Sequence, residues 1–126
     1  MRILYYDCFS GISGDMHLGA MLDLGVDPEH LLGQLGKLGL DGWDIKISRD
    51  RRKGITGTRV DVILDKESKD SKVHRNLDDI SGIINRSKLD EAIKLRSIRM
   101  FEKLAEAEAK IHGVGIDEVH FHEVGA

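Results

Sequence analysis

A turn near the amino terminus has the residue types of an anion-binding loop. It follows a short apolar segment, residues 3–6, and it contains Ser10, Gly11, Ser13 and Gly14. Glycine lets the backbone come close to a ligand, and the free N–H groups of a helix N-terminus favour phosphate or carboxylate. These four residues are therefore predicted to bind phosphate or a nucleotide, with a side chain at either glycine clashing with the chain or with the ligand. The alternative is a tight turn in which Ser13 only caps the helix.

Two carboxylates and a thiol adjoin this turn. Asp7 and Cys8 precede it and Asp15 follows it. Acidic groups argue against an anion alone, but they can hold a hard cation that bridges to phosphate. Cys8 can serve as a thiolate ligand, or it can be a small buried hydrophobic residue. The glycine spacing matches neither the dinucleotide-binding fingerprint nor the P-loop.

A His-x-His pair near the carboxyl end has the spacing of two metal ligands. On a strand, His120 and His122 face the same side. Imidazole suits nickel, zinc and copper. Two imidazoles leave a metal's coordination incomplete, so other segments must contribute. The predicted ligand set is His120, His122, Asp7, Asp15 and Cys8. The alternative for the histidines is a solvated strand face.

A basic cluster at Arg49, Arg51, Arg52 and Lys53 interrupts an otherwise acidic chain. We interpret it as a solvated turn, with contact to a substrate phosphate as the second interpretation. No aromatic residues alternate with these charges, as a single-stranded RNA platform would need. The net charge is −3, so nucleic acid is not an expected partner.

Hydrophobic periodicity and capping residues predict the elements that must position these groups. The helix after the glycine turn should end at Gly25, Asp27 and Pro28 should start the next, and Ser87 with Asp90 resembles a capping box. The predicted strands are 3–6, 43–47, 60–64 and 119–124. Apolar and polar residues alternate in 43–47 and again in 60–64, so these two strands are predicted to form a hairpin. The predicted helices are 15–24, 28–38, a short one after Asn76 and a long one ending at His112.

This order predicts an α+β fold. Strand, helices, strand, strand, helices, strand corresponds to the ferredoxin-like β-α-β-β-α-β arrangement. We expect a small, largely antiparallel four-stranded sheet with helices on one face, built from residues 1–126 as a single domain. The last strand would lie beside the first and bring His120 near Asp7.

Size and composition narrow the class of protein. A chain of 126 residues with 40% apolar residues can form one core. A single cysteine excludes a disulfide within the chain, which favours a reducing compartment, and we expect the cytoplasm. No apolar run approaches the roughly 20 residues that cross a bilayer, so no membrane association is expected.

Residues 7–16 with 18–25 resemble the opening of the LarC family, the nickel-insertion proteins of lactate racemase cofactor maturation. Residues 54–58, 74–80 and 120–126 resemble further family motifs and come in the family's order. The resemblance implies insertion of Ni²⁺ into pyridinium-3,5-bisthiocarboxylic acid mononucleotide. It also implies CTP hydrolysis, a further Mn²⁺ or Mg²⁺, and classification as a lyase, a nickel chelatase.

Two departures from the family pattern qualify this implication. Residues 65–73 contain no histidine, where family members often carry a histidine-rich stretch. Family proteins are also much longer, so the resemblance implies an amino-terminal portion, from a split protein or a fragment, that needs the carboxy-terminal portion or a partner chain. The alternative is a non-catalytic metal- or nucleotide-binding module that acts only with a partner, and a homo-oligomer stays open.

Overall fold

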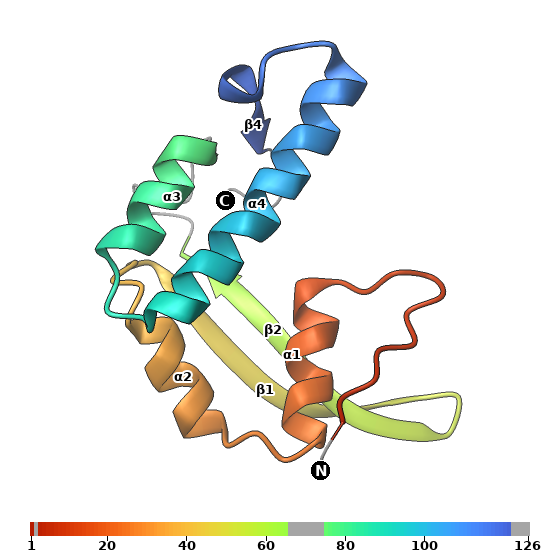
Figure 1. Ribbon diagram of the computed structural model, residues 1–126. Coiled ribbons are helices and arrows are strands. Elements are labelled where there is room, and N and C mark those ends of the chain that lie inside the picture. Colours follow the sequence, from red (N-terminus) through yellow and green to blue (C-terminus); the bar gives the residue numbers. More distant parts are fainter. Residues whose placement is uncertain (2, 66–74, 122–126) are drawn as a thin grey trace.

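The computed structural model describes residue 1, residues 3–65 and residues 75–121 (Figure 1). The elements are α1 (Gly14–Asp23), α2 (Pro28–Gly36), β1 (Trp43–Arg52), β2 (Ile55–Leu64), β3 (Arg75–Asn76), α3 (Leu77–Arg86), α4 (Glu91–His112), the short 3₁₀ helix η2 (Ile116–Glu118) and β4 (His120–Phe121). In this part of the chain no helix is both long and apolar enough to cross a membrane.

Local capping residues set the helix boundaries. Asp27 caps α2 by accepting a hydrogen bond from the Glu29 amide, and Gly113 ends α4 in the left-handed conformation. The predicted helices are thereby confirmed. The proposed capping box at Ser87 is wrong, because the Ser87 hydroxyl donates to the Ile84 carbonyl and closes α3 instead. Asp90 alone caps α4.

The hairpin of β1 and β2 is confirmed and depends on a two-residue turn. The strands pair antiparallel from Trp43 opposite Leu64 to Arg52 opposite Ile55. Lys53 and Gly54, the two turn residues, have φ angles of 49° and 86°. Two consecutive positive φ angles are the requirement of a type I′ turn, whose twist matches that of the flanking strands.

The α+β class and the antiparallel pairing are confirmed, but the ferredoxin-like order is not. The described strands form two separate two-stranded sheets, β1 with β2 and β3 with β4. Residues 3–6 form no strand, because no described strand supplies the hydrogen-bonding neighbour that an isolated strand requires. The prediction that the last strand lies beside the first is therefore wrong, since Phe121 lies opposite Arg75.

The main hydrophobic core lies between α3 and α4. Phe121 of β4 is 3% exposed and meets Phe101 of α4 edge to face, with ring centroids 5.8 Å apart. Figure 1 shows α3, α4 and β4 at one end of the molecule and α1 with the hairpin turn at the other. The core residues are Ile80, Ile84, Ala105, Ala109, Val119 and Phe121.

Candidate functional site

Helix α1 packs directly against β2. Gly19 is buried where a Cβ atom would overlap the Thr58 carbonyl oxygen. Asp23, at the end of α1, accepts hydrogen bonds from the Thr58 amide and from the Thr58 hydroxyl, each at 2.8 Å. Arg49 of β1 donates to the same carboxylate at 2.7 Å. Because the Thr58 amide donates to Asp23 and not to β1, α1 covers the outer edge of β2 and holds its own first turn beside the hairpin.

These hydrogen bonds make the attachment of α1 sensitive to pH. The Thr58 amide, then the Thr58 hydroxyl and Arg49, hold the pKa of the Asp23 carboxyl below its usual value of 3.8. A carboxyl whose pKa is lowered by folding stabilises the folded state fully above the unfolded pKa, and the stabilisation is lost as pH falls through the folded pKa.

Replacing Asp23 by asparagine is therefore expected to remove a stabilisation that is present at neutral pH and absent in acid. The difference in urea midpoint between wild type and Asp23→Asn should be largest near pH 6, should begin to shrink as the pH falls towards the ordinary value of 3.8, and should vanish once the pH lies below the lowered folded pKa. Asp41→Asn is the control, since Asp41 is exposed and has no hydrogen bond or ion pair among the described residues. A constant difference across this pH range would contradict the assignment.

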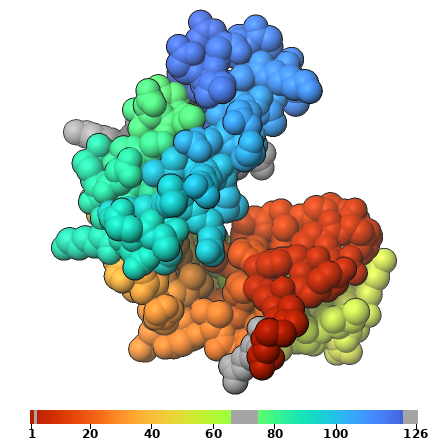
Figure 2. All heavy atoms as spheres, in the orientation of Figure 1, coloured from red at the N-terminus to blue at the C-terminus, as the bar shows by residue number. Residues whose placement is uncertain are grey.

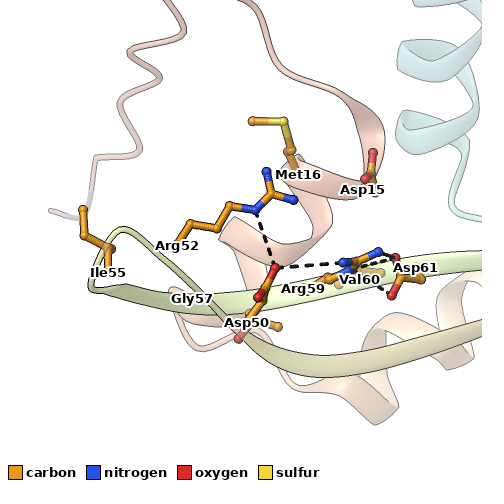
Figure 3. A pocket seen from close by; sticks show the side chains of 10 residues that line it. Asp15, Met16, Asp50, Arg52, Ile55, Gly57, Arg59, Val60 and Asp61 are labelled. Carbon is orange, nitrogen blue, oxygen red and sulfur yellow. Dashed lines mark hydrogen bonds and ion pairs between the residues drawn. The ribbon is translucent and has the colours of Figure 1, made fainter.

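The first turn of α1 and the hairpin line an open pocket of about 500 Å³, which we call the hairpin pocket (Figure 3). Asp15 and Met16 contribute from α1. The hairpin contributes Asp50, Arg52, Ile55, Gly57, Thr58, Arg59, Val60 and Asp61.

Two arginines and two aspartates form an ion-pair network in this pocket. Arg59 Nε lies 2.9 and 3.0 Å from the two Asp61 carboxylate oxygens. The Asp50 carboxylate lies 3.9 Å from Arg59 Nη1 and 3.7 Å from Arg52 Nε, as Figure 3 shows. The Arg52 side chain is 85% exposed, and its ion pair with Asp50 is long. A guanidinium held this loosely can turn to a phosphate group, which arginine binds through two parallel hydrogen bonds.

Sequence reasoning missed Arg59, Asp50 and Asp61. The signal that could have found them is the alternation of the strands. Arg59 and Asp61 are two residues apart on β2 and share a face, and Asp50 lies opposite Gly57 on that same face. The structure also brings in Arg52, which the sequence reading placed in a solvated turn.

The predicted phosphate turn adjoins the hairpin pocket at Asp15. Ser13 caps α1, with its hydroxyl oxygen 3.4 Å from the Met16 amide. A side-chain hydrogen bond from Ser13, then the backbone amides of Asp15 and Met16 and the charge of Arg59, hold the pKa of the Asp15 carboxyl below its usual value. The Asp15 carboxylate therefore stays charged at neutral pH, at the helix N-terminus and beside the pocket.

The prediction that a side chain at Gly11 or Gly14 would clash with the rest of the chain is wrong. A Cβ atom on Gly11 or Gly14 would meet nothing within 4 Å. Gly11 is nevertheless required by its φ of +78°, in a turn that its amide closes onto the Cys8 carbonyl at 3.0 Å. Ser10 is exposed in the same turn.

The predicted nickel ligands do not come together among the described residues. Asp7 and Cys8 are exposed in the segment before α1, whereas β4 lies at the other end of the molecule (Figure 1). His120 is exposed on β4 between two buried residues, and His122 lies outside the described residues. In the described ranges no three His, Cys, Asp or Glu side chains form a group that could hold a metal ion. The strand pairing that would have joined His120 to Asp7 is absent there, because β4 pairs with β3.

Comparison with known proteins identifies close relatives. The family described as nickel insertion protein matches residues 4–126. Over its whole length the chain is 53% identical to the pyridinium-3,5-bisthiocarboxylic acid mononucleotide nickel insertion protein of Clostridium kluyveri, of which it covers 34%. Proteins of the same name from Clostridium acetobutylicum and Geobacillus kaustophilus are each 46% identical to it, over 37% and 32% of their lengths. The chain thus spans about a third of the length of these curated relatives. No solved structure matches it.

Proposed function

The chain belongs to the nickel insertion protein family, and from this premise we propose that it is the amino-terminal domain, residues 1–126, of a protein that inserts Ni²⁺ into pyridinium-3,5-bisthiocarboxylic acid mononucleotide. The observation that carries the proposal is the family match over residues 4–126. Nickel is then a substrate of the reaction, which is that of a nickel chelatase, a lyase. We place the reaction in the cytoplasm, where the free and exposed Cys8 stays reduced.

We assign the phosphate of the mononucleotide to the hairpin pocket and the adjoining turn. Arg52 and Arg59 supply positive charge from the hairpin, and the first turn of α1 supplies the amide end of a helix. Ser10, Gly11, Ser13 and Gly14 would form the other wall of this phosphate site. An anion can compete with the half-buried carboxylates of Asp50 and Asp61 for the two guanidinium groups.

We assign nickel to His120 and His122, with Asp7, Cys8 and Asp15 as co-ligands. Nickel binds well to imidazole and thiolate, whereas magnesium prefers oxygen ligands. His120 is exposed and its ring nitrogens have no hydrogen bond within the described residues, so it is accessible to a metal. In the structure His120 lies on β4, away from α1 and the segment before it, which carry Asp7, Cys8 and Asp15. A complete nickel site would therefore need either a rearrangement of the chain or additional ligands from outside the described residues.

The rest of the reaction belongs, in our proposal, to the two thirds of the protein that this chain does not span. That portion would bind CTP with Mn²⁺ or Mg²⁺ and would act together with this domain. The second candidate function is a metal- or nucleotide-binding module without catalysis of its own. The chain spans only about a third of the length of its relatives, and this favours the second function for the chain when it acts without the remaining portion.

Reconstitution tests both candidates. The chain is combined with the remaining two thirds of the Clostridium kluyveri relative, Ni²⁺, the mononucleotide, CTP and Mn²⁺, and the nickel-containing product is measured by mass spectrometry. We expect product only in the complete mixture. Product from the remaining portion without this chain would overturn the proposal, and product from this chain alone without CTP would exclude the non-catalytic module.

A further inference from the structure

Helix α4 carries a second apolar surface beside the one that it buries in the core. Six residues are separated alternately by four and three positions, which places them on one line along the helix. We call this line the α4 stripe; it consists of Ile93, Ser97, Met100, Leu104, Ala107 and Ile111. Its length is about 27 Å at 1.5 Å per residue.

Three large apolar residues of the α4 stripe are uncovered, whereas Leu104 also packs against the core and Ser97 is half-buried. Met100 is 69% exposed, Ile111 is 79% exposed and Ile93 is 44% exposed. The core lies against the neighbouring side of the helix, through residues such as Ala105 and Ala109. Figure 2 shows α4 (cyan to blue) open along one side of the molecule. Successive residues of a helix are rotated by about 100° around its axis. The side of α4 that faces the core and the stripe together cover an arc of about 200°, which is about twice the apolar arc of a helix that packs on one side only.

A row of cations follows the outer side of the stripe. Arg96, Lys103 and Lys110 recur every seven residues next to it, away from the core. Lys103 pairs with Glu106 at 2.9 Å, whereas Arg96 and Lys110 have no ion pair within the described residues. An apolar line with one basic border fits an amphipathic helix whose apolar line has an acidic border.

A second copy of this chain does not satisfy that requirement. Two stripes packed antiparallel would place the two basic rows against each other. Packed parallel, the basic row would face Lys94, Phe101 and Glu108, which include only one acidic residue. The relatives carry about two thirds of their length outside the region that this chain matches, and this portion is the nearest source of another helix.

We propose that the α4 stripe is the docking surface for an acidic amphipathic helix from the remaining two thirds of the nickel insertion protein. The stripe then joins the two portions of the protein, and it does so on a helix that contributes no residue to the lining of the hairpin pocket. This inference rests on membership of the family and does not depend on which portion performs the chemistry.

Site-specific photo-cross-linking in the assembled protein tests the inference. A photo-cross-linking amino acid replaces Met100 in one variant and Leu95 in another, and mass spectrometry identifies the attached peptides. Leu95 is the matched control, because it is 54% exposed on the same helix but lies off the stripe. We expect position 100 to attach to an acidic, helix-periodic segment of the remaining portion, at least about tenfold more than position 95 does.

A charge reversal tests the acidic character of the partner. The double variant Arg96→Glu with Lys110→Glu should lower the yield from position 100 at least about fivefold. Attachment to a second copy of this chain, equal yields from positions 95 and 100, or a yield that the reversal leaves unchanged would each overturn the proposal. Nickel insertion is assayed separately, so that loss of the proposed function and loss of docking are distinguished.

Discussion

Replacing Gly19 by valine is expected to separate α1 from β2. The Cβ atom of any residue at position 19 would overlap the Thr58 carbonyl oxygen and would lie 3.4 Å from the Thr58 carbonyl carbon. Neither group can move aside, because one is in a helix and the other is main chain in a paired strand. Overpacking of this kind costs about 1–3 kcal/mol, and we expect about 3 kcal/mol since the contact is with backbone.

Gly33→Val in α2 is the matched control for this substitution. Gly33 is also a helical glycine, but a Cβ atom there would meet nothing within 4 Å. Valine has a higher helix propensity than glycine, so Gly33→Val should be neutral or stabilising by a few tenths of a kcal/mol. Hydrogen exchange at the Thr58 amide is the most direct measurement, because its acceptor is Asp23 at the end of α1. Protection of that amide in Gly19→Val equal to protection in Gly33→Val would contradict the prediction.

The same variant tests the link between packing and the hairpin pocket. Asp15 and Met16 reach the pocket only because α1 lies along β2. If the phosphate of the mononucleotide binds there, Gly19→Val should weaken its binding in the assembled protein, whereas Gly33→Val should not. If Gly19→Val removes the hydrogen-exchange protection of the Thr58 amide but leaves binding of the mononucleotide unchanged, the phosphate binds outside this pocket.

The double variant His120→Ala with His122→Ala is expected to lose nickel binding. Loss of a group that only orients a metal ligand already lowers metal affinity by about 10- to 100-fold, so loss of two ligands should lower it at least about 100-fold. His120 is exposed, and its neighbours Val119 and Phe121 supply the buried contacts of β4. Replacing His120 should therefore leave the thermal midpoint of the protein unchanged, so a loss of nickel binding would not reflect unfolding.

Calorimetry with Ni²⁺ in the assembled protein measures this effect. His30→Ala is the control, because His30 is exposed in the first turn of α2 and has no hydrogen bond or ion pair within the described residues. Its nickel affinity should equal that of the wild type. Equal affinity in the wild type and the double histidine variant would place nickel elsewhere and leave His120 as part of a solvated strand face.

Features that depend on neighbours in the chain were predictable. Helix ends are indicated by residues that satisfy or terminate the backbone of an adjacent turn of helix, as do Asp27 with Pro28, Asn76 and Gly113. The alternation of Ile45 and Ile47 with polar residues likewise predicted the hairpin. Family membership was also predictable, because the long motifs at residues 7–16 and 120–126 are specific.

Features that depend on distant parts of the chain were not predictable. An apolar run such as residues 3–6 looks like a strand, but a strand forms only where another strand supplies hydrogen-bonding partners. The capping box at Ser87 failed for a related reason, since one serine can close the preceding helix or open the next. Arg49 of the basic cluster looked solvated because its partner Asp23 becomes a neighbour only when α1 packs against the hairpin.

The sequence by itself thus determined the helix ends, the hairpin and the family, because each depends on residues adjacent in the chain or on motif identity. Tertiary structure alone decided which edge α1 covers, through contacts between Asp23 and Thr58, 35 residues apart. It also decided that β4 pairs with β3, which separates His120 from Asp7. The physical reason is that local hydrogen bonds are fixed by chain proximity, whereas long-range packing is chosen by the whole set of surfaces competing to be buried.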